Sequence, residues 1–237
     1  MVGGATIIDT VDGWLVWEHP NYPAYYLPRA AFAETALNPT GASTVHPNLG
    51  ESELCDLMDH EGSARLFESG PGDSMTDAVR VEWGAVDMWF EEDKQVFVHP
   101  KDPYKRVEIL ASSRSVRIEL EGRVLAETDR GTLVLETGLI ARWYVPRPDV
   151  RFNHLVASTS RTHCPYKGEA RYWSLNIGDQ TETERVQTNP VQTDIAWSYQ
   201  APTHESAELA GLLCFYAERV DTFVDGRGLD RPETPFV

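Results

Sequence analysis

Residues 132–147, TLVLETGLIARWYVPR, contain two short runs rich in aromatic and β-branched residues, TLVLETG and RWYVPR. Apolar and polar residues alternate roughly along each run, which is typical of strands with one buried face. Similar runs surround this segment and are separated by Gly, Pro, Asp and Asn: VRIELEG (116–122), RYWSLNIG (171–178), IAWSYQ (195–200) and DTFVDG (221–226). The sequence therefore predicts a mainly β protein.

Helical patterns are scarce. The best candidates are ESELCDLMDH (51–60) and HESAELAGLLCFY (204–216), and the second can equally lead into a strand. We therefore expect compact antiparallel β domains with little helix.

The composition excludes several classes of partner. The chain has 37 acidic and 21 basic residues and a net charge of −16, whereas nucleic acids and anionic membranes attract basic surfaces. Its three cysteines, Cys55, Cys164 and Cys214, are an odd number at wide spacing, which indicates a reducing compartment. The sequence has neither a signal-peptide pattern nor a run of about 18 apolar residues. We expect a cytoplasmic protein that binds neither nucleic acid nor membrane.

The chain repeats itself with a shift of 118 residues. An ungapped alignment of 9–51 with 127–169 places DTVDGWLVWE on ETDRGTLVLE and YYLPR on WYVPR. Thirteen of the 43 aligned positions are identical, where roughly two or three would agree by chance. This agreement indicates an internal duplication.

The ends of the two copies also show similarity, at a slightly different shift. MWFEEDKQVFVHP (88–100) resembles CFYAERVDTFVDG (214–226), since each has an apolar pair, an acidic residue and an aromatic-valine run. We predict two similar domains, 1–106 and 107–237, and expect them to pack as an intramolecular pseudo-dimer.

One turn differs between the copies in its reactive residues. TVHPNLGE (44–51) and THCPYKGE (162–169) share Pro, Gly and Glu, and Pro and Gly are what a turn requires. The reactive residues of the second copy are Cys164, Tyr166 and Lys167, in place of His46, Asn48 and Leu49. Because the turn does not need these three, they are candidates for function.

Four motifs of the second copy carry a family resemblance: ETGLIARWYVPRPDV (136–150), RTHCPYKGEARYWS (161–174), AWSYQAP (196–202) and CFYAERVDTFVDG (214–226). Over residues 113–226 the chain resembles the domain of unknown function 427 family, which is also labelled nucleotidyltransferase-like. The resemblance implies two tandem antiparallel β-tent (Mss4-like) domains, of which the N-terminal one is degenerate. It implies no established chemistry.

The family pattern also implies a set of functional residues: Glu136, Tyr144, Asp149, Cys164, Tyr166, Lys167, Tyr172, Trp197 and Tyr199. Arg142 joins this set because a strand can project Arg142 and Tyr144 to one face. The first copy keeps counterparts of Glu136 and Tyr144 as Glu18 and Tyr26 but lacks the Cys and Lys. Its pocket is therefore either degenerate or adapted to another task.

We expect a cofactor-independent enzyme that acts on a small anionic or carbonyl-bearing molecule in the second copy. Lys167 would anchor or activate the substrate, and Tyr166 or Tyr144 would donate a proton. Asp149 or Glu136 would act as base or orient Lys167, although an internal salt bridge is an equal interpretation of either acid. Lys167 can alternatively be a surface residue of the turn.

The remaining candidates also have two interpretations. Cys164 is a candidate nucleophile but can equally be a pocket wall. The second copy is dense in aromatic residues, which either line a ligand pocket or pack in the core: Tyr144, Tyr166, Tyr172, Trp173, Trp197, Tyr199 and Tyr216. We expect Arg142, Tyr144, Tyr172, Trp197 and Tyr199 to bind the substrate.

Two other classes of function remain open: a non-catalytic small-molecule-binding or sensor protein, and an interaction protein. Convergence of Lys167, a carboxylate and a phenol on one empty point would favour catalysis, whereas an aromatic cage with Lys167 in solvent would favour binding. The sequence has no Cys-x-x-Cys pair and no phosphate-binding loop with adjacent acids. We therefore expect no metal and no cofactor, and nucleotidyl transfer is disfavoured.

Overall fold

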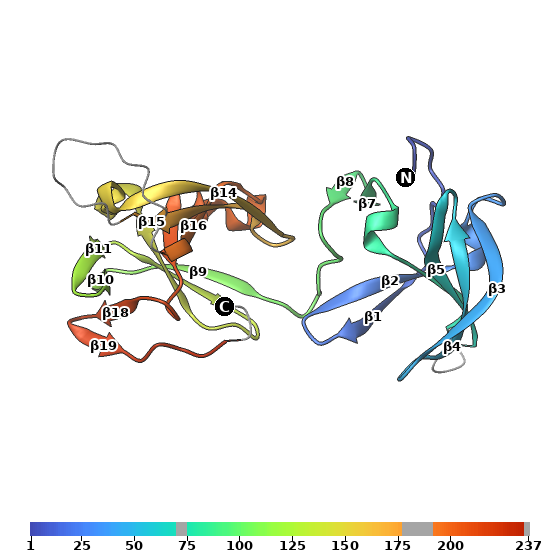
Figure 1. Cartoon of the computed structure of the whole chain (residues 1–237), viewed down its shortest axis with the longest axis horizontal. Coiled ribbons are helices and arrows are strands. Elements are labelled where there is room, and N and C mark those ends of the chain that lie inside the picture. Colours follow the sequence, from blue (N-terminus) through green and yellow to red (C-terminus); the bar gives the residue numbers. More distant parts are fainter. Residues whose placement is uncertain (70–74, 177–191, 235–237) are drawn as a thin grey trace. The chain divides into compact units, whose positions relative to one another are not determined.

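The computed structural model describes residues 1–69, 75–176 and 192–234, and it consists mainly of antiparallel β-sheets (Figure 1). The mainly β class is thus confirmed. The chain divides into two compact units, Met1–Pro103 and Tyr104–Val237, close to the boundary expected at residue 106. Helical structure in the described ranges consists of short 3-10 turns, none of them long enough to cross a membrane.

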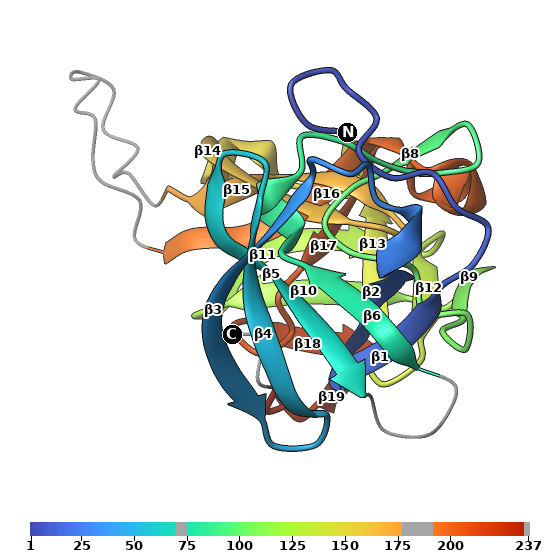
Figure 2. The ribbon, with the colours of Figure 1, turned by 90° about the vertical axis from the view of Figure 1, so that its right-hand side faces the viewer.

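The first unit is built on a six-stranded antiparallel sheet with the order β1-β2-β6-β5-β4-β3, and Figure 2 shows β3, β4, β5 and β6 side by side. Its strands are β1 (Trp14–His19), β2 (Tyr22–Pro28), β3 (Leu37–His46), β4 (Gly50–Leu57), β5 (His60–Ser69) and β6 (Thr76–Val81). A separate hairpin follows, formed by β7 (Trp89–Glu91) and β8 (Lys94–Val96).

Both faces of this sheet are covered by apolar clusters. Val79 and Val81 of β6 belong to one cluster, and Ala78, the chain neighbour of Val79, belongs to the other. This alternation follows from strand geometry, because successive side chains point to opposite faces. The second face also buries Tyr26 and Phe67.

The second unit contains a seven-stranded sheet with the order β14-β15-β16-β17-β13-β12-β9 and a four-stranded sheet with the order β11-β10-β18-β19. The strands of the larger sheet are β9 (Val107–Ala111), β12 (Thr132–Glu136), β13 (Arg142–Pro146), β14 (Leu155–Cys164), β15 (Gly168–Leu175), β16 (Gln192–Pro202) and β17 (Leu212–Phe215). Those of the smaller sheet are β10 (Val116–Leu120), β11 (Arg123–Thr128), β18 (Asp221–Val224) and β19 (Arg227–Leu229).

The main core of the second unit contains residues of both sheets, for example Ile118 from the smaller sheet and Val145 and Trp173 from the larger one. Tyr144 and Tyr172 are the chain neighbours of Val145 and Trp173, and they belong to a second cluster. Alternation along the strands therefore places this second cluster on the opposite face of the seven-stranded sheet, which we call the pocket face.

The two units share one strand order. In the second unit, β12-β13-β17-β16-β15-β14 follows the same path as β1-β2-β6-β5-β4-β3 in the first, and β9 is added beside β12. An isolated bridge joins Ile8 to Phe32, and its counterpart 118 residues later joins Ala126 to Val150. The shift seen in the sequence is therefore also a shift between equivalent backbone positions.

The strand registers correct the match of 88–100 with 214–226. Tyr26 pairs with Arg80 in the first unit, and Tyr144 pairs with Cys214 in the second, so Arg80 is the equivalent of Cys214. The hairpin β7-β8 then takes the place of β18-β19 along the chain. The sequence match was wrong because aromatic-valine runs recur in many strands, whereas pairing fixes one register.

The structure also corrects the helix expected over 51–60. This segment forms β4 and the turn that follows it, because β4 pairs with both β3 and β5 and buries Cys55 and Leu57 on one face. In 204–216, a 3-10 turn (η5, His204–Leu209) leads into β17, which is the alternative that the sequence left open.

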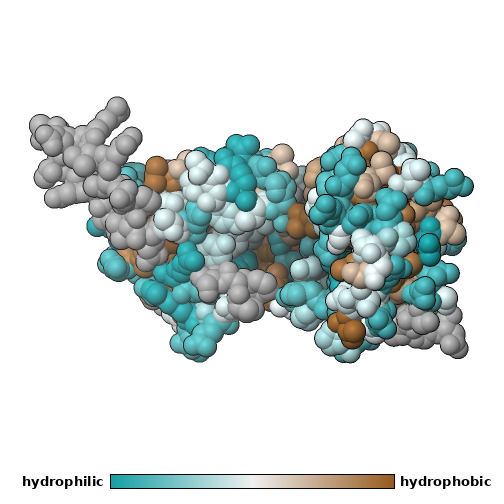
Figure 3. All heavy atoms as spheres, turned by 45° about the vertical axis from the view of Figure 1, so that its right-hand side comes forward, coloured by the Kyte–Doolittle hydropathy of each residue, from teal (hydrophilic) through white to brown (hydrophobic). Residues whose placement is uncertain are grey.

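The visible surface is largely hydrophilic, with hydrophobic residues in small separate areas (Figure 3). A charge of −16 is compatible with such a surface, because like charges keep molecules apart in solution.

Candidate functional site

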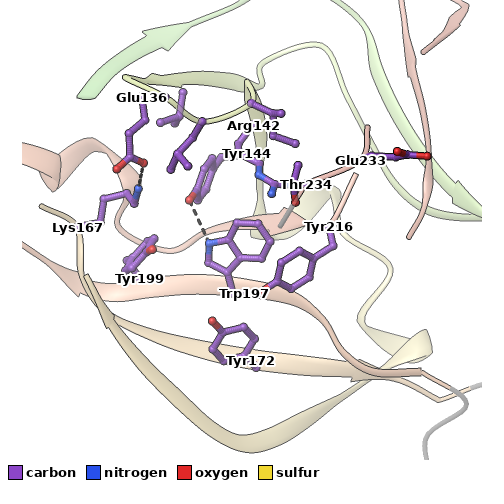
Figure 4. A pocket seen from close by; sticks show the side chains of 14 residues that line it. Glu136, Arg142, Tyr144, Lys167, Tyr172, Trp197, Tyr199, Tyr216, Glu233 and Thr234 are labelled. Atoms are coloured by element: carbon purple, nitrogen blue, oxygen red, sulfur yellow. Dashed lines mark hydrogen bonds and ion pairs between the residues drawn. The ribbon is translucent and has the colours of Figure 1, made fainter. Parts of the chain in front are cut away.

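A cavity of about 520 Å³ opens on the pocket face of the seven-stranded sheet (Figure 4). Aromatic residues make up much of its wall: Tyr144, Tyr172, Trp197, Tyr199 and Tyr216. Four charged residues also line it: Glu136, Arg142, Lys167 and Glu233. The volume lies within the range of roughly 300–1,000 Å³ that is usual for small-molecule sites.

Lys167 and Glu136 point toward one another in this cavity and form an ion pair (Figure 4). Their side chains are only 11% and 8% exposed, respectively. The two buried charges stabilise each other, because burying either charge alone would carry a large desolvation cost. The interpretation of Lys167 as a surface residue is therefore wrong.

The turn before β15 fixes the direction of Lys167. The hydroxyl groups of Thr203 and Ser206 donate hydrogen bonds to the carbonyl oxygen of Tyr166, the second over 3.0 Å. Gly168 has a φ of +98°, and a Cβ atom there would lie 3.3 Å from the carbonyl oxygen of Ala201. Glycine is required for this backbone, which turns the lysine inward.

Tyr144 is 1% exposed, and its hydroxyl oxygen accepts a hydrogen bond of 3.1 Å from the indole Nε1 of Trp197. Burial holds the pKa of Tyr144 well above its ordinary value of 10.0, and the neighbouring Cys214 and Tyr199 raise it further. The phenol therefore keeps its proton at neutral pH. Because Trp197 already donates to the oxygen, the proton of Tyr144 is a donor toward other groups.

Tyr199 is the second buried phenol beside the ion pair. Burial raises its pKa well above 10.0, and the nearby Cys164, Tyr172 and Glu136 add to the effect. Its hydroxyl group has no hydrogen-bond partner among the residues that the structure describes. Glu136 also raises the pKa of Tyr144, and its side chain lines the same cavity as both phenols.

A second ion pair, Arg142 with Glu218, lies at another part of the wall. Two guanidinium nitrogens of Arg142 donate to the two carboxylate oxygens of Glu218 over 2.6 and 2.7 Å. The centre of the guanidinium group lies 5.4 Å from the ring centroid of Trp197 and 5.7 Å from that of Tyr216. Bidentate geometry and aromatic contact together hold Arg142 in one position.

Glu218 makes the stability of the second unit depend on pH. Burial alone would raise its pKa, but hydrogen bonds from Arg142 and Thr234 outweigh burial and hold the pKa below its ordinary value of 4.5. Its contribution is therefore complete above pH 4.5 and is lost as the pH falls through the lower folded-state value. We expect the excess stability of the wild type over Glu218→Gln to shrink below pH 4.5 in urea denaturation. A difference that stays constant down to about pH 3 would contradict this.

Seven of the expected site residues line the cavity: Glu136, Arg142, Tyr144, Lys167, Tyr172, Trp197 and Tyr199. Their strands bring them to one face, as the alternation of aromatic and polar residues along RWYVPR and IAWSYQ requires. Two residues at or next to the cavity wall, Glu218 and Thr234, were not predicted from the sequence; they follow β17 and β19, respectively. Their loops gave no periodic signal that could have found them.

Three expected site residues lie elsewhere. Asp149 binds the guanidinium group of Arg130 through both oxygens and accepts a hydrogen bond of 2.8 Å from Thr128. It therefore forms the internal salt bridge that the sequence left as its alternative interpretation. Cys164 is partly buried against the cluster of the pocket face, and Tyr166 contributes its carbonyl oxygen to the turn. Neither side chain lines the cavity.

In the first unit, two arginines occupy the equivalent part of the sheet. Arg65 pairs with Arg80 as Trp197 pairs with Cys214. Arg65 therefore replaces Trp197 of the cavity wall, and Arg80 replaces the buried Cys214. The same strand order thus forms with a different set of side chains. The fold therefore does not require Trp197 or Cys214 at these positions.

Glu18 and Tyr26, the counterparts of Glu136 and Tyr144, are in direct contact in the first unit. The hydroxyl group of Tyr26 donates to the carboxylate of Glu18, which also lies 3.4 Å from Arg65 and 3.3 Å from Arg80. Leu49 replaces the lysine and is buried. The glutamate therefore has cationic partners in both units. The second unit differs in having the amine of Lys167 and a tyrosine, Tyr144, whose hydroxyl proton is not donated to the glutamate.

No group of three or more His, Cys, Asp or Glu side chains that could hold a metal ion occurs within the described residues.

A family model described as a domain of unknown function (DUF427) matches residues 1–67 and 108–226 of the chain. The matched segments include most of the first unit's sheet and the whole lysine-bearing turn of the second unit. No curated protein sequence matches the chain.

Proposed function

The chain belongs to the DUF427 family, whose name assigns no activity, and we propose that its second unit is an enzyme that transfers protons in a small carbonyl-bearing or anionic molecule. One observation carries the proposal: the ion pair of Lys167 and Glu136 lies in an aromatic cavity beside the phenols of Tyr144 and Tyr199. A base, a cation and neutral donors at one wall are the groups that acid–base catalysis requires.

In this mechanism the carbonyl oxygen of the substrate accepts hydrogen bonds from Tyr144 and Tyr199. Burial favours the protonated form of both phenols, so they donate and do not act as bases. Lys167 adds a positive charge near the oxygen. Such donors stabilise the negative charge that develops on an oxygen when a neighbouring C–H bond breaks.

Glu136 is the proposed base. Its carboxylate takes the proton from the carbon next to the carbonyl group, and the electron pair of the broken C–H bond moves toward the carbonyl oxygen. Return of the proton to the same carbon gives exchange, and return to another carbon gives an isomer. The ion pair with Lys167 holds the carboxylate of Glu136 in place between turnovers.

The aromatic walls would hold a planar or apolar part of the substrate. Trp197 and Tyr216 have ring centroids 4.5 Å apart and form one side of the cavity. Aromatic surfaces of this kind bind flat groups by contact, while a few polar groups fix the orientation.

The test is deuterium exchange in a metabolite mixture. Wild-type protein and the double variant Lys167→Met/Glu136→Gln, which keeps similar side-chain volumes, are incubated in D₂O with small-molecule cell extract. Untargeted mass spectrometry then follows each metabolite. We expect at least one carbonyl compound to gain deuterium at carbon with the wild type and not with the double variant.

A second candidate function is non-catalytic binding of a small molecule. It is favoured by the arrangement of charges, because Lys167 and Arg142 are each already paired with a glutamate inside the wall. The same experiment separates the two functions. A metabolite that is retained by the wild type without exchange contradicts catalysis and supports binding, and the absence of both exchange and retention contradicts both.

A further inference from the structure

A second cavity of about 180 Å³ lies beside the first in the second unit. Its wall includes residues of both sheets, such as Ile118 and Leu229 from the smaller sheet and Trp143 and Phe215 from the larger one. These side chains are apolar or aromatic. The polar residues of its wall are Arg142, Thr222 and Asp230, and Arg142 is paired with Glu218. Most of the wall is therefore suited to a hydrocarbon group.

Two residues, Ile140 and Arg142, line both cavities. Arg142 begins β13 on the pocket face, and its chain neighbour Trp143 lines the second cavity. The shared residues therefore stand between the two spaces. Glu218 binds Arg142 from one side, and Thr234 donates a hydrogen bond of 2.8 Å to Glu218.

The first unit shows that the fold does not require this arginine. Ala24 occupies the position 118 residues before Arg142, on a strand with the same place in the sheet. A side chain that is dispensable for the strand, yet held by a buried carboxylate and two aromatic rings, has a role in the cavity itself.

We propose that the second cavity is an apolar subsite for the tail of the ligand and that Arg142, held by Glu218, is the partition that limits ligand length. This inference rests on the proposed function, which places the polar end of the ligand at Lys167. With the partition in place, short planar carbonyl compounds are bound best. Without it, the cavities join and accept a compound with an alkyl tail.

The experiment compares acetophenone with 4-hexylacetophenone, which carries a flexible apolar tail. Binding is followed by the indole N–H resonances of ¹⁵N-labelled protein, since Trp197 reports the first cavity and Trp143 the second. The variant is Arg142→Ala/Glu218→Ala, because loss of the arginine alone would leave a buried carboxylate unpaired. Arg130→Ala is the matched control, since it breaks a surface arginine–carboxylate pair that lines neither cavity.

Acetophenone should shift the Trp197 resonance in the wild type and leave that of Trp143 unchanged. The hexyl compound should bind the double variant at least about tenfold more tightly than the wild type, because six methylene and methyl groups leave water. The hexyl compound should also shift the Trp143 resonance of the double variant. The control variant Arg130→Ala should behave as the wild type. If the NMR spectrum shows that the double variant is unfolded, Ile140→Ala is used instead, because Ile140 is the other residue that lines both cavities.

The outcomes separate this inference from the proposed function. If acetophenone shifts Trp197 but the hexyl compound gains no affinity for the opened variant, or leaves Trp143 unmoved, the partition is disproved and the pocket stands. If acetophenone moves Trp197 in none of the proteins, the carbonyl site and the inference built on it are both overturned.

Discussion

Replacing Lys167 with leucine, the residue at the equivalent position 49, should lower the free energy of unfolding by about 3–5 kcal/mol. The loss arises because Glu136, whose side chain is 8% exposed, would remain buried without its cation. Urea denaturation followed by tryptophan fluorescence measures the effect. The variant should also lose the deuterium exchange expected of the wild type.

The double variant Lys167→Leu/Glu136→Gln separates stability from chemistry. Glutamine removes the unpaired charge, so most of the lost stability should return, whereas the exchange activity should not. A single variant as stable as the wild type would show that the pair is not a tightly coupled unit. A double variant that recovers exchange would remove Lys167 and Glu136 from the mechanism.

Replacing Tyr144 with phenylalanine should lower the turnover number by a factor of about 10²–10³, the usual cost of losing one donor to a developing oxyanion. The Michaelis constant should change far less, because the hydrogen bond strengthens as charge develops in the transition state. The measurement is the initial rate of deuterium exchange on the metabolite that the profiling identifies. The ring itself stays, so packing in the cluster of the pocket face is kept.

Tyr172→Phe is the matched control for this prediction. Tyr172 lines the same cavity, but its hydroxyl group is hydrogen-bonded to Thr162 over 2.8 Å and is therefore already engaged. We expect its removal to change the rate little. An equal loss in both variants would mean that the phenols act through packing, and Tyr144 would lose its place as the proton donor.

The internal duplication allows each pocket residue to be compared with its counterpart in the same chain. Glu136 and Tyr144 recur as Glu18 and Tyr26, but Tyr26 donates directly to Glu18 in the first unit. In the second unit Glu136 binds Lys167 instead. The recurring residues therefore form a common framework, and the lysine releases the phenol for another partner.

Much of the candidate site was predicted from the family resemblance, and the period of strands explains why these residues meet. In RWYVPR and IAWSYQ, alternate residues must share a face, which groups Arg142 with Tyr144 and Trp197 with Tyr199. The family pattern also pointed to Asp149, but this residue lies in a short 3-10 turn after β13 and not on the face that Arg142 and Tyr144 share. Its carboxylate reaches Arg130 and Thr128 instead.

The sequence alone determined the mainly β class, the repeat at a shift of 118 and the turn that carries Lys167, since alternation, internal identity and the Pro and Gly positions are local properties of a chain. Only the tertiary structure decided which acid faces the lysine. Glu136 and Lys167 are 31 residues apart. They meet because β12, which ends at Glu136, and the strands β14 and β15, whose connecting turn holds Lys167, belong to one sheet. Strand order and register are set by packing over the whole sheet, so no local pattern could select Glu136 over Asp149.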